Sequence, residues 1–368
     1  MNILGIESSC DETACAVVKD GREVLSNVVY TQIKLHQPWG GVVPEIASRA
    51  HVEKISGVIA EAIHQLQETT GKGLESIDAV AVTYGPGLAS SLLVGLAAAK
   101  GLALALGKPL IGVNHIEAHL HTPFLCEAGD TPCAAPEDLA PALGLAVSGG
   151  HTTWIEMPTY GSYKIIGQTL DDAAGEAFDK AAKLLGLGYP GGPVIDRVAK
   201  EYAAGLGGAK PDLIAFPKGR PRPGVSALAG LEADYCTSFS GLKTALLNYV
   251  NKTYGAGADR EIPAADLPRI VASYQEAIVA VLADRTARAL RRRAYKALIV
   301  GGGVSLNGRL RARLGDVAQA AGVPLLLAKP KFCGDNAAMI AGLAHYRRNL
   351  VGDAALATDV NPTLQPGD

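Results

Sequence analysis

Several features that would assign a chain to a familiar class are missing from these 368 residues. The six cysteines show no CxxC spacing, which fits reduced cytosolic thiols better than a secreted disulfide framework. The formal net charge is only -2, so the chain does not wrap nucleic acid by bulk charge, and any RNA contact must be local or shared with a partner. The N-terminus has no basic segment before its first apolar run, so we expect no secretory signal.

An uninterrupted membrane-spanning run is also missing. The longest apolar stretch, 88–106, contains Ser90, Ser91 and Lys100, and a lysine at the centre of a membrane helix costs about 3 kcal/mol. We therefore expect a buried helix, no membrane partner and a cytoplasmic protein. Two nucleotide motifs are absent as well, because there is no GxxxxGK(S/T) loop and the glycines at 301–303 do not continue as GxGxxG.

The clearest chemical signal present is a pair of histidines four residues apart, His115 and His119. The preceding run 109–113 is typical of a short buried strand, and Asn114 is a plausible helix N-cap. On a helix, residues four apart share one face with Cβ atoms about 5 to 6 Å apart, which lets two imidazoles bind one metal ion. The pair would then lie at the carboxyl end of a strand, where open α/β sheets place ligands.

An isolated HxxxH pair is as often a partly buried polar stripe as a metal site, so context must decide. The zinc-protease version needs glutamate directly after the first histidine, where this chain has Ile116. Glu117 lies about 200° round the helix from His115 and therefore cannot serve as the protease-type base.

Two stretches, 3–30 and 143–170, repeat one order of elements: strand, polar turn, strand, tight hairpin, strand. Three positions match at one constant offset, namely Leu4 with Leu143, Ser9 with Ser148 and Thr13 with Thr152. We interpret the repeat as a duplicated module. Two lobes of like topology would then face each other across a cleft, as the length of the chain also suggests.

Each copy of the module is followed by segments of the right length for an α/β layer. We expect strands at 79–83, 110–113, 297–300 and 324–328, and helices at 89–106, at 267–293, from 308 and from 336. The predicted organisation is lobe I with the metal-binding helix at 1–125, a Pro/Ala-rich insert at 126–142, lobe II with the nucleotide-binding loops at 143–334, a C-terminal helix at 335–352 that begins with a metal ligand, and a flexible tail at 353–368.

Three turns of small residues follow apolar strands and offer backbone N–H groups to a phosphate. They are Ser8-Ser9-Cys10-Asp11, Ser148-Gly149-Gly150-His151 and Gly301-Gly302-Gly303. One such turn is weak evidence, but three of them on two like lobes describe a nucleotide cleft. Asp179, Asp196 and Asn307 can hold hydroxyls of a bound nucleoside, although each is equally well a capping or surface residue.

A late carboxylate, Asp335, stands at the start of the last predicted helix. Taken alone, such a residue is more often an N-terminal cap than a ligand. With the histidine pair it would complete a set of two histidines and one carboxylate, the pattern typical of iron(II) with open coordination positions.

With further blocks in the same order, the sequence resembles the tRNA N6-adenosine threonylcarbamoyltransferase family, once labelled O-sialoglycoprotein endopeptidases. The resemblance covers nearly the whole chain. Its blocks are 5–13, 85–87, 115–119, 147–152, 175–180, 189–193, 238–244 and 335–339. It implies the actin-like fold of the superfamily of acetate and sugar kinases, Hsp70 and actin, in which two duplicated ribonuclease-H-like α/β lobes surround a nucleotide cleft.

The resemblance also implies a site. One divalent metal is expected on His115, His119 and Asp335, with iron(II) first and zinc or magnesium as alternatives. The expected pocket for threonylcarbamoyl-AMP comprises Ala146, Val147, Ser148, Gly149, Gly150, Asp179, Gly192, Asp196 and Asn307. Asp11 and Glu12 stand where actin-like proteins place acidic residues near the phosphates and the metal, and they are the candidate catalytic residues.

The implied reaction transfers the threonylcarbamoyl group from threonylcarbamoyl-AMP to N6 of the adenosine adjacent to the tRNA anticodon and releases AMP. The implied partners are tRNA, an actin-like paralogue subunit and a small ATPase subunit, with the adenylate made by a separate synthase. The alternatives are a metalloprotease, which relies on the histidine pair alone, and a non-catalytic actin-like scaffold or weak ATPase. Basic segments at 218–222 and 291–293 are candidate tRNA contacts, although a charge run is usually a solvated face.

Overall fold

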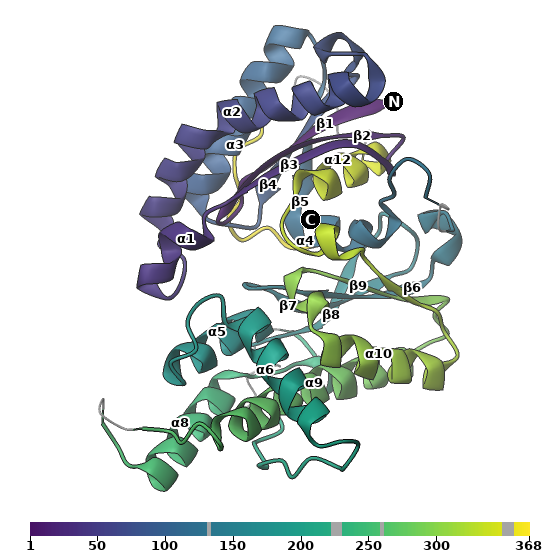
Figure 1. Ribbon diagram of the computed structural model, residues 1–368. Coiled ribbons are helices and arrows are strands. Elements are labelled where there is room, and N and C mark those ends of the chain that lie inside the picture. The colour runs from purple at the N-terminus through teal and green to yellow at the C-terminus, as the bar shows by residue number, and fades with distance from the viewer. Residues whose placement is uncertain (131–133, 222–229, 258–260, 348–356) are drawn as a thin grey trace.

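The computed structural model describes residues 1–130, 134–221, 230–257, 261–347 and 357–368. These residues form two α/β lobes, which lie one above the other in Figure 1. Each lobe is built on one five-stranded sheet. The chain builds lobe I, then lobe II, and returns to lobe I with its last helix.

Lobe I has the strand order β3-β2-β1-β4-β5. The first three strands form an antiparallel meander, and the last two add in parallel. Asp20 and Gly21 connect β2 to β3 with φ values of 51° and 74°, as a type I′ hairpin turn requires. The strands are β1 Asn2–Glu7, β2 Glu12–Lys19, β3 Glu23–Thr31, β4 Ala79–Gly85 and β5 Leu110–Asn114.

Helices cover both faces of this sheet (Figure 1). Leu4 and Ile6 of β1 face the long helices α2 and α3, whereas Ile3 faces α12, so the central strand is buried on both sides. Burial on both faces explains why these strands are near-continuous apolar runs. The helices of lobe I are α1 Ile33–His36, α2 Pro44–Thr70, α3 Ala89–Leu106, α4 His115–His121 and α12 Ala337–Tyr346.

Helix α3 is the one helix within the described ranges that is long and apolar enough, by length and composition, to cross a membrane. The sequence predicted it to be buried, but only one face is. Leu92, Leu96 and Ala99 pack in the core of lobe I, while Leu93 and Leu104 on the other face are 49% and 65% exposed. The helix therefore closes a core on one side and presents an apolar surface on the other.

Lobe II repeats the topology of lobe I. Its sheet has the order β10-β9-β6-β7-β8, which matches lobe I strand for strand when β6 is placed on β1. This confirms the duplicated module. The strands are β6 Ala142–Val147, β7 Thr152–Met157, β8 Lys164–Gln168, β9 Ala297–Gly301 and β10 Leu325–Leu327. Its helices are α5 Ala174–Leu184, α6 Gly191–Gly205, α8 Ser240–Tyr254, α9 Leu267–Leu290, α10 Gly308–Ala321 and α11 Pro330–Cys333.

Helix α4 lies between the lobes and packs on sheet strands of both. Glycines in lobe II make this close approach possible. A Cβ added at Gly301 of β9 would lie 2.0 Å from the carbonyl oxygen of His119, and one added at Gly144 of β6 would lie 2.6 Å from Leu120 Cδ1. Gly5 of β1 does the same for α12, because its Cβ would lie 2.6 Å from the carbonyl oxygen of Ala337. Glycines therefore bring both α4 and α12 close to the sheets.

Two boundary predictions need correction. The last helix begins at Ala337 rather than at 335, and its N-cap is Asn336, whose side chain accepts from Met339 N at 3.1 Å. The predicted flexible tail, 353–368, is docked on lobe I over its described part, 357–368. Asn361 N donates to Tyr84 O at 2.8 Å, and Gly367 N donates to Glu117 Oε1 at 2.8 Å. Hydrogen bonds from its backbone to strand β4 and to a side chain of helix α4 fix this segment despite its polar composition.

Residues 126–142, predicted as an insert, leave lobe I through a bridge between Cys126 and Glu23 and enter β6 at Ala142. Residues 131–133 of this insert lie outside the described ranges, as do residues 348–356, which include the predicted end of the last helix and the start of the predicted tail.

Candidate functional site

A cavity of about 800 Å³ lies between the lobes. The turns after β1 and β4 line it from lobe I, and the turns after β6 and β9 line it from lobe II. Parts of α5 and α6 and the loop at Asp335 complete the walls. The cavity therefore occupies the carboxyl ends of the parallel strands, where α/β sheets bind ligands, and its volume suits a nucleotide-sized molecule.

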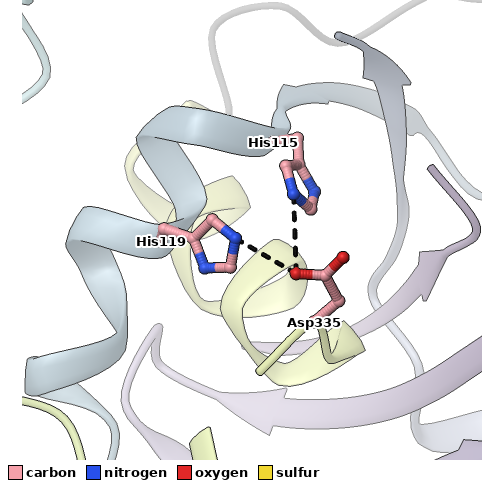
Figure 2. A group of neighbouring side chains, drawn as sticks. All are labelled: His115, His119 and Asp335. Carbon is pink, nitrogen blue, oxygen red and sulfur yellow. Dashed lines mark ion pairs between the residues drawn. The ribbon is translucent and has the colours of Figure 1, made fainter. Parts of the chain in front are cut away.

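His115, His119 and Asp335 converge beside this cavity (Figure 2). The Nε2 atoms of His119 and His115 lie 3.1 and 3.6 Å from Oδ1 of Asp335, and the two imidazole centroids are 4.6 Å apart. Ligand atoms of all three residues lie within 4.8 Å of one another. The histidines are buried behind Asp335, which lines the cavity wall.

The local sequence explains how these side chains become available. The Asn114 side chain accepts from Ile116 N at 2.9 Å and Glu117 N at 3.2 Å, which starts α4 at His115 and puts both histidines on one face. At the other end of the chain, Asn336 supplies the cap of α12. Asp335 is thereby released from capping, and its carboxylate turns toward the histidines.

The protease interpretation fails because of Ile116 and Glu117, the two residues that follow His115. Ile116 is buried in the core between α4 and the sheet of lobe II. Glu117 accepts from Gly367 N and from Arg347 Nη2, which lies 2.5 Å from Glu117 Oε2. Both carboxylate oxygens of Glu117 are thus used away from the triad, and neither residue can activate a water there.

The electrostatics of the triad favour a positive charge. Burial opposes the charged form of His115, but the carboxylates of Glu7 and Asp335 outweigh it and raise its pKa to about 9. Burial likewise works against ionised Asp335, yet His115 and His119 lower the pKa of Asp335 well below its usual range. The buried carboxylate of Glu7 and the partly buried carboxylate of Asp335 thus share one pocket with two imidazoles, and a cation there is stabilised.

The surroundings of His119 show whether the donor atoms of this pocket fit a metal ion. Both of its ring nitrogens are buried and have no hydrogen-bond partner among the described residues, although Nε2 faces Asp335. A buried imidazole without partners is costly unless another ligand satisfies it. Two imidazoles and one carboxylate converging on a common point are a donor set that fits a divalent transition metal.

The sequence model of the family described as tRNA N6-adenosine threonylcarbamoyltransferase matches residues 23–342. The chain belongs to this family. Among similar proteins of that name, one from Anaeromyxobacter dehalogenans strain 2CP-1 is 51% identical over 340 residues, 92% of each chain. One from Clostridium perfringens strain SM101 is 45% identical over 367 residues, which are 100% of this chain and 98% of the relative. The chain is therefore a transferase of tRNA modification, and the family implies a divalent metal.

Similar solved structures establish the fold alone. HypF from T. kodakarensis aligns with a TM-score of 0.59 at 15% identity and covers 97% of this chain and 50% of that one. Component A of the Acidaminococcus fermentans (R)-2-hydroxyglutaryl-CoA dehydratase aligns with a TM-score of 0.50, also at 15% identity, over 95% and 99%. With the two matching sheets, they confirm the two-lobed actin-like α/β fold.

Asp11 and Glu12, the candidate catalytic residues, line the lobe I side of the cavity. Burial raises the pKa of Asp11, and the nearby Asp335 carboxylate raises it further. The pKa of Glu12 lies well above its ordinary value, first because of burial and then because of Asp11 and Asp335. These carboxylates are therefore stronger bases than exposed ones.

The predicted nucleotide-binding residues of β6 divide into two groups. Ser148, Gly149 and Gly150 line the cavity, and the N–H groups of both glycines have no acceptor among the described residues. A Cβ at either glycine would meet no atom within 4 Å, so the turn is open to a ligand. Ala146 and Val147 are buried inside β6 and do not line the cavity.

The other predicted pocket residues, Asp179, Gly192, Asp196 and Asn307, all line the cavity. Asp179 Oδ1 accepts from Gly191 N at 2.7 Å, and burial raises the pKa of this carboxyl. Asp196 accepts from Gly308 N, at the start of α10. Asn307 caps α10 and donates through Nδ2 to Gln275 at 2.8 Å, so it holds the wall in place as well as facing the cavity.

The two basic segments differ in their surroundings. Arg292 pairs with Glu232 at 2.7 Å and Arg293 with Glu156 at 3.4 Å, so most of the charge at 291–293 is neutralised within the protein. Lys218 and Arg220 line a groove of about 400 Å³ beside the start of α8, and no ion pair holds either of them in the described part of the chain. Arg222 lies outside the described residues.

Sequence reasoning did not single out Glu7, and it named His151 only as the last residue of a phosphate-binding turn, with no role for its side chain. Glu7 ends β1, is fully buried and contacts His115. Its signal was a lone carboxylate in an otherwise apolar strand, which needs a buried partner. His151 lines the cavity with its ring centroid 6.2 Å from that of His115, and burial together with His115 and His119 lowers its pKa to about 3. His151 therefore presents a neutral imidazole.

Proposed function

We propose that the chain transfers the threonylcarbamoyl group from threonylcarbamoyl-AMP to N6 of the adenosine adjacent to the tRNA anticodon, releasing AMP, at a divalent metal held by His115, His119 and Asp335. One observation carries the proposal. A two-histidine, one-carboxylate set stands directly behind a cavity whose opposite wall offers free glycine amides. The first arrangement suits a cation, and the second suits a phosphate.

The donor's orientation follows from the charges on the two walls. Asp11, Glu12 and Asp335 make the lobe I wall acidic, which repels a phosphate. The amides of Gly149 and Gly150 on lobe II attract it. We therefore assign the AMP part to lobe II, with its ribose hydroxyls toward Asp179 and Asp196 and its phosphate at the glycine turn. The carbamoyl group then points toward Asp335.

The transfer forms a bond between N6 of the adenosine and the carbamoyl carbon, and it breaks the bond from that carbon to the phosphate oxygen, so AMP leaves with the electron pair. Asp11 or Glu12 accepts the proton that the attacking amine loses, because burial makes these carboxylates stronger bases. A bound divalent cation would stabilise the negative charge that develops on the carbonyl oxygen. The walls of the cavity align the two reactants.

We favour iron(II) as the metal, with zinc or magnesium as alternatives. Two imidazoles and a carboxylate with open positions are typical of iron(II). Zinc accepts the same ligands, whereas magnesium prefers an all-oxygen set.

We further propose an actin-like paralogue and a small ATPase as partner subunits, with the adenylate supplied by a separate synthase. The exposed apolar face of α3, with Leu93 and Leu104, supports a protein partner on lobe I, because solvated helices rarely keep such a face. Lys218 and Arg220 are the proposed contacts for the tRNA backbone. Since tRNA is the substrate, we place the protein in the cytoplasm.

The experiment combines a metal assay with a modification assay. Protein loaded with iron(II), zinc or magnesium is mixed with threonylcarbamoyl-AMP and tRNA, with and without the partner subunits. We expect His115→Ala to lose the metal and to lower modification by more than about 100-fold. His64→Ala, at an α2 side chain that is 61% exposed, is the matched control and should change neither. Full modification by His115→Ala would refute the metal assignment, and metal-dependent peptide hydrolysis without modified tRNA would favour the protease.

A further inference from the structure

The carboxylate of Glu7 lies at the junction of three elements. Its Oε1 accepts from Ser9 N at 2.5 Å, and its Oε2 accepts from the Thr83 hydroxyl at 2.5 Å. The same Oε2 lies 3.1 Å from Nδ1 of His115. Glu7 is 0% exposed, so all of its interactions are with the protein. It thus joins the turn after β1, strand β4 and the metal-binding helix α4.

We propose that Glu7 is a positioning residue, which holds the His115 imidazole in the tautomer that leaves Nε2 free to bind the metal. This rests on the metal site of the proposed function. A carboxylate can only accept hydrogen bonds, so the nitrogen that faces it must carry the hydrogen. That nitrogen is Nδ1. In the neutral ring that binds a metal, the lone pair of His115 is therefore on Nε2, on the side that faces Asp335.

Ser9 is the second neighbour of the same nitrogen and agrees with this assignment. Its Oγ lies 3.1 Å from His115 Nδ1, and a hydroxyl oxygen accepts a shared hydrogen bond as readily as it donates. The opposite tautomer would set the Nδ1 lone pair against the carboxylate of Glu7, which is repulsive in a buried site.

The two histidine ligands differ in this respect. Nδ1 of His119 has no hydrogen-bond partner among the described residues, so no outer group fixes the ring of His119. Glu7 therefore acts on one ligand only. Through Oε1 it also fixes the turn that carries Asp11, so it sets the position of the metal relative to the acidic wall.

Glu7→Gln is the test substitution, because it keeps the shape but removes one acceptor. A single amide oxygen cannot serve both Ser9 N and His115 Nδ1, and its NH₂ group would face a donor. Titration of metal-free protein with cobalt(II) as a spectroscopic probe should show an affinity about 10- to 100-fold weaker than wild type. Thr83→Val removes a different donor to Glu7 and leaves the carboxylate, so it should weaken binding much less.

Three outcomes decide the matter. Wild-type cobalt(II) affinity in Glu7→Gln, with His115→Ala still unable to bind, would overturn the role of Glu7 and leave the proposed function standing. Retained affinity in His115→Ala would overturn the metal site and the role of Glu7 with it. If Glu7→Gln does not fold, nitrogen NMR on metal-free wild type decides, at a pH above the raised pKa of His115, where the ring is neutral and carries one hydrogen. A hydrogen on Nε2 of His115 would then overturn the assignment, and a hydrogen on Nδ1 would support it.

Discussion

The two lobes share one strand order, yet the turns that they present to the cavity carry opposite chemistry. At the offset that matches Ser9 with Ser148, the acidic residues Asp11 and Glu12 of lobe I correspond to Gly150 and His151 of lobe II. Both turns follow the first strand of their sheet and both line the cavity. The same backbone arrangement thus presents different groups: lobe I presents carboxylates and the proposed metal ligands, and lobe II exposes backbone amides.

A glycine supports each of these turns from the neighbouring strand. A Cβ at Gly87, after β4, would lie 2.6 Å from the carbonyl oxygen of Ser9, and one at Gly302, after β9, would lie 2.3 Å from that of Val147. Gly302 also has a φ of 98°, which favours glycine. The scaffold of the two turns is therefore equivalent, and only the side chains differ.

The largest expected effect separates the two turns. Gly302→Ala should destabilise the protein by about 4 kcal/mol, since backbone strain adds to a clash with Val147, and it should weaken AMP binding more than metal binding. Gly87→Ala should weaken metal binding more than AMP binding. Calorimetric titration with AMP and with cobalt(II) measures the two affinities. Gly303→Ala, where a Cβ meets nothing within 4 Å, is the control. Equal losses of both ligands in both variants would contradict separate roles for the turns.

A second prediction concerns the C-terminal segment, which docks on lobe I. Arg347 pairs with the buried Glu117 and lies over the Tyr163 ring of lobe II, 5.3 Å from its centroid. Arg347→Ala should lower the free energy of unfolding by about 3 kcal/mol, because a buried carboxylate loses its partner. Arg197→Ala, which breaks an exposed pair with Glu201, should cost less than about 0.5 kcal/mol. Urea denaturation measures the free energy of unfolding of both variants. Similar losses in the two variants would show that the buried pair stabilises the protein no more than the exposed pair does.

The smallest effects concern pH and should have opposite signs in the two lobes. Burial raises the pKa of Glu12, so its contribution to stability is present below its ordinary pKa and is lost as pH rises through the raised value. His151 has a lowered pKa, so its contribution is present above its ordinary pKa and is lost as pH falls below it toward about 3.

Thermal unfolding of metal-free protein measures these two contributions. Relative to wild type, Glu12→Gln should gain stability as pH rises above the ordinary pKa of Glu12, whereas His151→Gln should gain stability as pH falls from about 7 to about 5. Differences that do not change with pH would contradict these pKa directions.

Local patterns predicted much of this fold. The helix at 89–106 has the predicted bounds, and the strands at 79–83, 110–113, 297–300 and 324–328 were predicted within two residues at each end. Apolar runs bounded by glycine and capping residues depend on residues that are neighbours in the chain, so the elements that they predict have nearly the same bounds in the folded protein. The duplicated order of strands was visible for the same reason.

Other features had local signals that the sequence analysis did not use. Helix α2, Pro44–Thr70, was not among the predicted elements, although Ile55, Val58, Ala62 and Leu66 follow helical spacing. A single charged residue in a buried strand, such as Glu7, also indicates that a buried partner exists, although the sequence does not identify that partner.

The docked C-terminal segment could not be predicted from its composition. Its hydrogen bonds go to Tyr84 and Glu117, far away in sequence, and a polar stretch rich in Asp, Pro and Gly is usually loose. Likewise, the choice between Asp335 and Asn336 as the helix cap depends on whether the histidines attract the carboxylate of Asp335.

The sequence by itself determined the periodic elements, the duplicated lobes, the common face of His115 and His119, and the turns able to offer amides, because each depends on residues that are neighbours in the chain. Only the tertiary structure decided that Asp335 faces those histidines, that Glu7 contacts the His115 ring, and that Gly301 lets α4 approach the sheet of lobe II. These arrangements join segments far apart in sequence, and packing of the two lobes selects them.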